Sequence, residues 1–326
     1  MREVIFIKKN KEKWAEYERF LQQPQPVDPM DLTHIYLDLT DDLSYAKTYY
    51  PQSQLIPYLN DLSGLAHRKI YKTKKESGSA IKRFYLHDFP LMFYQYRSYL
   101  LIAFLLFMLF ALIGWFSTGQ NSDFARLILG DAYMDMTLDN IQKGDPLAVY
   151  KQANEADMFL GITINNIKVA LYTFMMGLLF GIGTLYYLMQ NAIMLGAFQR
   201  FFFDKNLGWT SVKTIWLHGT IEISVIIVAA AAGFILASGI LMPGTYTRLQ
   251  SFRQKARDGL KVMISTIPFF IIAGFLEGFI TRHTDMPDWL AVFIIISSLS
   301  LIIFYYLILP VKIHQQKIQQ KLANYD

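Results

Sequence analysis

One histidine and two glutamates lie within, or at the edge of, segments that are otherwise uncharged. His218 and Glu222 are four residues apart and precede an uncharged run, 223–242. Residues with this spacing face the same side of an α-helix, so an imidazole and a carboxylate could pair there. Glu277 lies in a second apolar run, 262–280. Because a charge at membrane depth costs a few kcal/mol, such residues are usually paired or functional.

Three interpretations of these residues stay open. In the first, the glutamates pair with Arg200, Arg248 or the histidine and stabilise a helix bundle. In the second, they line a cavity that handles protons, ions or a substrate. In the third, the histidine and both glutamates bind a metal, although zinc sites usually use two histidines or cysteines. We favour the first and expect neither a metal nor a cofactor. The predicted polar membrane cluster is His218, Glu222, Glu277, Arg248, Arg200, Asn166 and Asn191.

Motifs of common enzyme classes are missing from the sequence. It contains no HExxH zinc motif, nucleophile elbow, P-loop or dinucleotide fingerprint. It also contains no cysteine, which excludes disulfides and thiolate chemistry. We therefore expect a protein without enzymatic activity, and the distant alternative is an intramembrane metalloenzyme.

The composition indicates a membrane protein. Of 326 residues, 53% are hydrophobic and 17% charged, against about 25% charged in soluble domains. The fold predicted is all-α: a polytopic integral membrane helical bundle, 98–311, with an N-terminal helical cytoplasmic domain, 1–97, and a short polar C-terminal tail, 312–326. The five hydrophobic segments are 99–116, 167–199, 215–242, 262–280 and 289–310.

The second hydrophobic segment is too long for a single straight span. Its uncharged part, from Val169 to Gln199, would form a helix of about 46 Å, against about 30 Å of hydrocarbon. The segment is either tilted or kinked, or it breaks near Gln190 and Asn191 into a re-entrant pair. We also expect Pro268 to kink the fourth segment.

The N-terminal domain shows helical periodicity. Apolar residues between Leu55 and Ile70 recur every three or four positions, which predicts one buried face in a bundle of three or four short helices. Aromatic and basic residues between Lys82 and Arg97 predict an interfacial helix before the first span. We expect this domain to bind a protein partner.

Charge asymmetry predicts the orientation. Basic residues precede Tyr99, whereas 118–164 is mainly acidic, which places the N-terminus in the cytoplasm. The net charge of +5 fits flanks that contact anionic membrane lipids better than nucleic acid. Five spans would leave the C-terminus outside, but 248–261 and 312–321 are basic. A re-entrant second segment would place both in the cytoplasm, so the side of the C-terminus stays open.

Small residues recur four positions apart within the hydrophobic segments. Such spacing allows close helix packing, within a protomer or between protomers of a homo-oligomer, and we favour this over direct ligand contact. The predicted packing positions are Gly177, Gly181, Gly233, Gly274 and Gly278.

The order of these motifs resembles the stage II sporulation protein M family. His218-Gly219-x-x-Glu222, Pro243-Gly244 with Arg248, and Ala273-Gly274-x-x-Glu277-Gly278 carry the resemblance. Asn165-Asn166 and Leu188-x-x-Asn191 also fit, and the similarity covers roughly 95–310. The N-terminal part resembles longer bacterial members that carry a cytoplasmic helical domain.

The resemblance implies a multi-pass protein of the bacterial inner membrane with no established catalytic activity. Sporulation members are membrane scaffolds that recruit or retain peptidoglycan-remodelling hydrolases. Longer members tend to be encoded beside MoxR-type AAA+ ATPases, von Willebrand A-domain proteins and RDD membrane proteins. The added N-terminal domain favours the second context, and we expect a non-enzymatic membrane scaffold. The alternative is a transporter or a lipid- or ion-handling protein that uses His218, Glu222 and Glu277.

Overall fold

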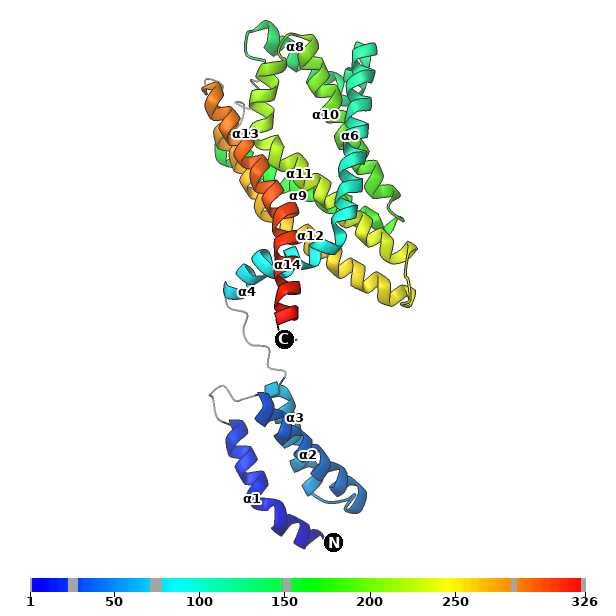
Figure 1. Ribbon diagram of the computed structural model, residues 1–326, viewed down its shortest axis with the longest axis vertical. Coiled ribbons are helices and arrows are strands. Elements are labelled where there is room, and N and C mark those ends of the chain that lie inside the picture. The colour runs from blue at the N-terminus through cyan, green and yellow to red at the C-terminus, as the bar shows by residue number, and fades with distance from the viewer. Residues whose placement is uncertain are drawn as a thin grey trace. The chain divides into compact units, whose positions relative to one another are not determined.

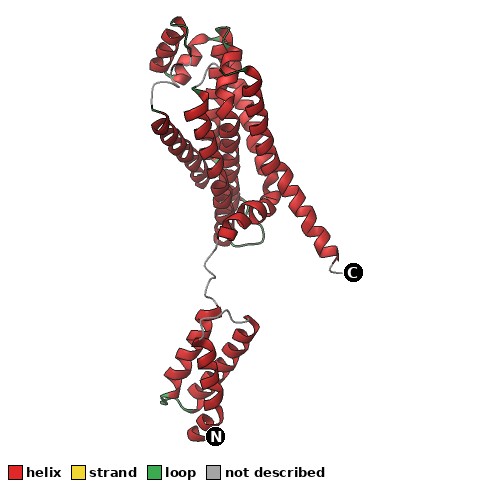
Figure 2. Cartoon of the chain, turned by 90° about the vertical axis from the view of Figure 1, so that its left-hand side faces the viewer, coloured by secondary structure: helices red, strands yellow, loops and turns green. Residues whose placement is uncertain are grey.

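All regular secondary structure among the described residues is helical (Figures 1 and 2). The computed structural model describes residues 2–22, 29–70, 78–146, 148, 154–282 and 286–323. The chain divides into two compact units, Met1–Ala80 and Ile81–Asp326, here called the N-terminal unit and the membrane unit.

Where the structure describes residues 2–70, the N-terminal unit consists of α1 (Glu3–Gln22), α2 (Pro29–Tyr49) and α3 (Leu55–Ile70). The predicted apolar face of α3 is buried, and Leu59 and Ala66 are fully covered. They pack against Trp14 of α1 and Leu39 of α2. The unit therefore has an apolar core of its own.

The membrane unit contains helices long enough and apolar enough to cross a bilayer. Among the described residues, five candidate spans meet both conditions: Ala80–Gln120, Glu155–Leu178, Gly208–Leu241, Arg248–Thr281 and Asp288–Gln320. The helices that follow the first span are α7 (Ser122–Leu129), α8 (Asp131–Gln142), α9 (Glu155–Met175), α10 (Ile182–Asp204), α11 (Gly208–Leu241), α12 (Arg248–Phe275), α13 (Asp288–Ile303) and α14 (Leu309–Ala323). The protein is thus a multi-pass helical membrane protein, as its composition predicts.

The aromatic segment before the first span belongs to the membrane unit. It runs through α4 (Gly78–Arg83), η1 (Phe84–Asp88), α5 (Phe89–Phe93) and η2 (Tyr94–Tyr96) into α6 (Arg97–Gln120). Phe89 and Phe93 are fully buried, and the Phe89 ring stacks on that of Tyr305 with centroids 5.6 Å apart. The boundary between the units therefore lies at residue 80 and not at 97, because these rings pack against protein.

The predicted break in the long second segment lies elsewhere. The backbone reverses between Met176 and Gly181, where Phe180 and Gly181 have φ angles of 54° and 83°. Glycine adopts this left-handed conformation without a steric penalty. Gln190 and Asn191, the predicted break, lie inside the continuous helix α10.

Helices α9 and α10 form an antiparallel hairpin around this reversal. The Thr184 hydroxyl of α10 donates to the Thr173 carbonyl of α9 at 2.7 Å. Next to this bond, the Tyr172 and Tyr187 rings stack with centroids 6.5 Å apart. Helix α10 therefore returns the chain to the end of the bundle from which α9 starts.

Contacts between helix ends define the two ends of the membrane unit. At one end, Tyr96 before α6 donates to Asp258 near the start of α12, and Tyr94 stacks on His314 of α14. We call this the basic end, because it carries the arginines and lysines of α12 and α14, among them Arg253, Arg257 and Lys317. At the opposite end, Trp115 of α6 contacts Phe203 of α10.

The C-terminal helix extends away from the bundle at the basic end (Figure 2). When α9 and α10 are counted as two passes, the chain passes between the two ends of the membrane unit an even number of times. The membrane unit therefore begins and ends at the basic end (Figure 1). The predicted tail is helical to Ala323, and 324–326 lie outside the described residues.

Most predicted packing glycines lie where a neighbouring helix of the same chain leaves no room for a Cβ. A Cβ at Gly177 would overlap the Gly233 carbonyl oxygen, and one at Gly274 would overlap the Thr163 hydroxyl. A Cβ at Gly278 would lie 3.1 Å from Cβ of Phe159. Gly181 differs, since it shapes the reversal between α9 and α10.

Helix α12 continues through Pro268 with help from a neighbouring segment. Proline has no N–H, so the carbonyl four residues earlier loses its helical donor. That carbonyl belongs to Ile264, and the Tyr85 hydroxyl donates to it at 3.2 Å. Tyr305 in turn donates to the Tyr85 carbonyl at 3.1 Å, which ties this segment to the last span.

Candidate functional site

A cavity of about 600 Å³ lies among the helices of the membrane unit. Its walls are largely apolar and include Phe107 of α6, Leu129 of α7 and Leu195 of α10. The polar residues that line it are Tyr133, Asn165, Asn166, Asn191, His218, Glu222 and Glu277. A few polar groups within largely apolar walls are typical of ligand sites.

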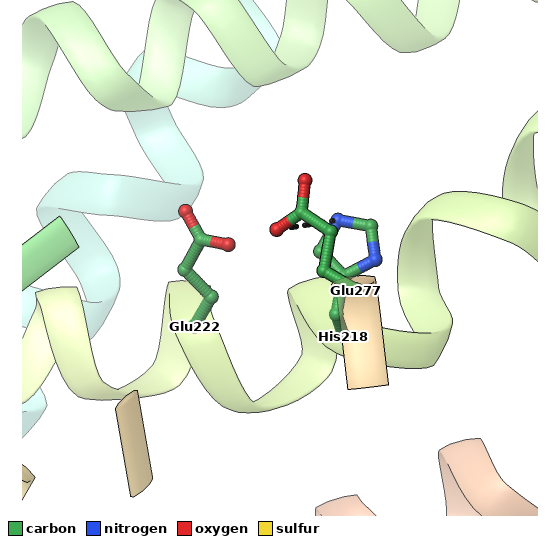
Figure 3. Close-up of side chains that lie close together, drawn as sticks. All are labelled: His218, Glu222 and Glu277. Carbon is green, nitrogen blue, oxygen red and sulfur yellow. Dashed lines mark ion pairs between the residues drawn. The ribbon is translucent and has the colours of Figure 1, made fainter. Parts of the chain in front are cut away.

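Helix α11 positions two of the titratable side chains. It is the most deeply buried of the candidate spans. His218 and Glu222 lie one turn apart on it, and Figure 3 shows both side chains on the same side of the ribbon. The predicted shared face of His218 and Glu222 is therefore confirmed.

Glu277 enters the cavity from a π-helical turn, η5 (Leu276–Thr281), that follows α12. Such turns are frequent at functional sites, because the extra residue per turn re-aims a side chain. Here the turn directs Glu277 towards α11 (Figure 3), where its Oε2 lies 3.7 Å from Nε2 of His218. The two side chains are only 13% and 6% exposed.

A threonine fixes the orientation of the imidazole. Nδ1 of His218 lies 3.0 Å from the Thr281 hydroxyl, which itself donates to the Leu276 carbonyl at 3.1 Å. The hydroxyl has one proton, so its oxygen accepts from the Nδ1–H of the imidazole. In the neutral tautomer Nε2 is then an acceptor, and it faces the Glu277 carboxylate.

The three titratable residues have the donor types and spacing of a metal site. One possible ligand atom from each of His218, Glu222 and Glu277 lies within 4.8 Å of the other two. Asn166 lines the same cavity as Glu222. In chemical terms the set could hold a cation, share protons or bind a polar ligand.

The structure separates the predicted polar cluster into two groups. Asn166 and Asn191 line the cavity with the three titratable residues. Arg200 instead pairs with Asp204 at 2.8 Å and lies over the Trp115 ring. Arg248 is exposed at the first turn of α12, which is at the basic end.

Of the three partners predicted for the glutamates, neither arginine pairs with them, whereas His218 approaches Glu277 at 3.7 Å. Among the described residues, no lysine or arginine forms an ion pair with either glutamate, and only His218 lies within 4.0 Å of Glu277. Both arginines lie near the ends of their helices, where long side chains reach polar partners without entering the core.

Sequence reasoning missed Thr281 and Tyr133. A signal for Thr281 was present, because it follows Glu277 by four residues, the spacing that also relates His218 and Glu222. Tyr133 gave no such signal. It belongs to α8, in the acidic stretch between the first two spans, and reaches the cavity only through tertiary folding.

Comparison with known families agrees with the sequence motifs. A family model described as Stage II sporulation protein M matches residues 103–282, which include every polar residue of the cavity. A second, described as Domain of unknown function (DUF8413), matches residues 4–72 in the N-terminal unit. No curated protein and no solved structure matches the chain. Because the first match covers more than half of the 326 residues, this protein belongs to the stage II sporulation protein M family.

Proposed function

We propose that this protein is a non-enzymatic scaffold of the bacterial inner membrane whose N-terminal unit recruits a soluble partner. The observation that carries the proposal is the separate apolar core of the N-terminal unit. A helical unit that is not needed to complete the membrane bundle is free to serve as a binding module. Membrane lipids, which we also predicted as partners, would surround the membrane unit.

The charge distribution supports a cytoplasmic N-terminus. The basic end carries Arg97, Arg248, Arg253, Lys255, Arg257, Lys261, Lys312 and Lys317. At the opposite end, α7 and α8 are rich in aspartate, with Asp123, Asp131, Asp135 and Asp139. Lysine and arginine favour the cytoplasmic side, so both termini of the membrane unit would lie there.

The lack of cysteine makes this orientation testable. We would introduce Asp139→Cys and, separately, Lys317→Cys, and treat intact spheroplasts with a membrane-impermeant maleimide. The first variant should be labelled at once and the second only after permeabilisation. The reverse pattern would contradict the orientation.

The family context suggests the class of partner. A MoxR-type AAA+ ATPase or a von Willebrand A-domain protein would meet the N-terminal unit in the cytoplasm. Peptidoglycan-remodelling proteins would meet the opposite end. The predicted homo-oligomer stays a proposal, because the packing glycines make contacts within one chain, and crosslinking in membranes would test it.

Co-purification would test recruitment. The full chain and a variant that lacks residues 1–77 would each be purified in mild detergent with the MoxR-type ATPase of the same organism. We expect the full chain to retain the ATPase and the shortened chain to lose it, with both eluting as single species. Equal retention by both would contradict a role for the N-terminal unit.

A second candidate function follows from the cavity. Three titratable residues line this cavity, which favours a function in handling ions, lipids or a small polar ligand. Flux of protons or cations into proteoliposomes, lost in Glu277→Gln, would favour this function over the scaffold. Equal leak with and without the protein would argue against it.

A further inference from the structure

We propose that His218, Glu222 and Glu277 bind one divalent first-row transition-metal ion, for which Zn²⁺ is the probe. The proposal goes beyond the scaffold function and does not depend on it. It reverses the expectation, drawn from residue types alone, that the protein binds no metal.

The first argument is the distance between the donors. Zinc bonds of about 2.0–2.2 Å in a tetrahedral arrangement place ligand atoms about 3.4 Å apart. Nε2 of His218 and Oε2 of Glu277 are 3.7 Å apart, and all three ligand atoms lie within 4.8 Å. The Glu222 carboxyl group points towards the other two side chains in Figure 3, so the remaining difference would have to be taken up by rotation of that group.

The second argument is the direction of the imidazole. Thr281 accepts the Nδ1 proton, so Nε2 presents its lone pair to a carboxylate oxygen. Two acceptors that face each other at 3.7 Å repel unless a cation or a proton lies between them. Metal-binding histidines typically donate their second ring N–H to a neighbouring oxygen, and Thr281 provides that oxygen here.

The third argument is charge. Two carboxylates face one cavity, and no lysine or arginine among the described residues pairs with them. In a low-dielectric setting an uncompensated charge is expensive. A divalent cation would neutralise both carboxylates at once, whereas a lysine or arginine would neutralise one.

The cavity supplies the remaining coordination. Three protein ligands leave a position for water or a small ligand, the pattern of zinc sites that are not purely structural. Asn166 and Asn191 line the same cavity and offer amide oxygens to whatever occupies that position. The apolar walls restrict the occupant to a small molecule or to the polar end of a longer one.

The test measures metal content directly. Full-length protein in detergent would be stripped with EDTA, incubated with Zn²⁺, freed of unbound metal and analysed by mass spectrometry of the metal. We expect about one zinc per chain. Glu277→Gln and Glu222→Gln should each lower the affinity at least 100-fold, and Co²⁺ in place of Zn²⁺ should give visible absorption bands that both variants lack.

Two further variants separate metal binding from folding. Thr281→Val keeps the side-chain shape but removes the oxygen that orients His218, and should weaken zinc binding about 10-fold. Asp258→Asn alters another buried carboxylate of the same unit, near the basic end, and should keep the full zinc content. Loss of zinc in Asp258→Asn, full retention in Glu277→Gln, or a wild-type protein without zinc would each overturn the proposal.

Discussion

The cores of the two units differ in the side chains that they bury. In the described part of the N-terminal unit, Ser63 is the one buried polar residue, and the core consists of residues such as Trp14, Leu39 and Leu59. The membrane unit buries polar side chains such as His218 and Gln199. Its outer surface instead exposes large apolar residues, among them Leu101, Phe104, Leu105, Phe116, Phe293 and Ile296.

This difference follows from the two solvents. Water drives apolar side chains together, so the N-terminal unit is held by burial of apolar area. Lipid is as apolar as leucine and offers no such force, so membrane helices associate through close backbone contact and hydrogen bonds. A polar residue in the membrane core therefore indicates an interaction, whereas a polar residue on the N-terminal unit usually indicates only its surface.

The largest expected effect tests the apolar core of the N-terminal unit. Trp14 is 2% exposed and its Nε1 donates to Asp42 at 2.8 Å. Trp14→Ala should destabilise this unit by about 4 kcal/mol, through lost apolar contacts and a cavity. Trp289, which is 71% exposed at the start of α13, provides the matched control.

Limited proteolysis of the full chain would measure this effect. Trp14→Ala should make residues 1–80 sensitive to protease while the membrane unit stays intact, and Trp289→Ala should cleave like wild type. Equal protection of Trp14→Ala and wild type would show that the N-terminal unit is not held by this core.

The second prediction compares one glycine from each unit. A Cβ at Gly196 in α10 would overlap the Ala111 carbonyl oxygen of α6, so Gly196→Ala should cost about 3 kcal/mol by forcing these helices apart. Gly64 in α3 has only the Arg68 guanidinium within 4 Å, at 3.5 Å. Gly64→Ala should therefore stabilise its helix by about 1 kcal/mol.

Thermal unfolding in detergent would show the sign of each change. A melting transition of the membrane unit that is unchanged in Gly196→Ala would contradict the importance of the α6–α10 backbone contact. A destabilised Gly64→Ala would indicate a contact that the structure does not contain.

Where one local signal controls the outcome, the sequence predicted the fold well. The periodicity of 55–70 predicted the buried face of α3. Three hydrophobic segments, 99–116, 262–280 and 289–310, each lie within one candidate span, and 215–242 ends one residue beyond another. The family match likewise agrees with the motifs around His218 and Glu277.

Errors arose where contacts between distant segments decide the structure. Phe89 and Phe93 of the aromatic segment 84–96 pack against Tyr305 and Tyr306 of the last span, so this segment belongs to the membrane unit and not to the N-terminal domain. The reversal at Phe180 carries no proline and no polar cluster, so the polar pair Gln190–Asn191 was a misleading signal. The four-residue spacing from Glu277 to Thr281 was a signal, but the π-helical turn that brings Thr281 to His218 has no sequence signature.

The third prediction compares two hydrogen bonds of the same type, from a tyrosine to an aspartate, one in each unit. Tyr96 donates to Asp258 at 2.7 Å in a buried setting, and Tyr17 donates to Asp38 at the same distance in an exposed one. Tyr96→Phe should cost about 2 kcal/mol, because it leaves a buried carboxylate without this donor. Tyr17→Phe should cost about 0.5 kcal/mol at neutral pH, since water replaces the lost partner.

Chemical unfolding of the two variants would give both values. If they are equal, burial does not distinguish the two bonds, and the contrast drawn between the units is wrong for hydrogen bonds. Asp258→Asn, which keeps an acceptor for Tyr96, should cost less than Tyr96→Phe.

The smallest expected effect concerns pH and the N-terminal unit alone. Partial burial, together with the hydrogen bond to Asp38, raises the pKa of Tyr17 from 10.0 to about 12. A folded-state pKa above the unfolded value stabilises the fold fully below pH 10. This contribution is lost as the pH rises towards 12, because the folded state must then give up a proton that it holds more tightly.

Tyr17→Phe isolates this contribution, because it removes the phenol hydroxyl and leaves every other side chain unchanged. Urea unfolding at pH 9, 10 and 11 would measure the stability of each protein. The signal would be the fluorescence of Trp14, obtained by subtracting the fluorescence of a Trp14→Phe variant measured under the same conditions. The difference between wild type and Tyr17→Phe should shrink as the pH rises through this window. A constant difference would mean that Asp38 does not favour the protonated phenol, and the bond would then be no more than a surface contact.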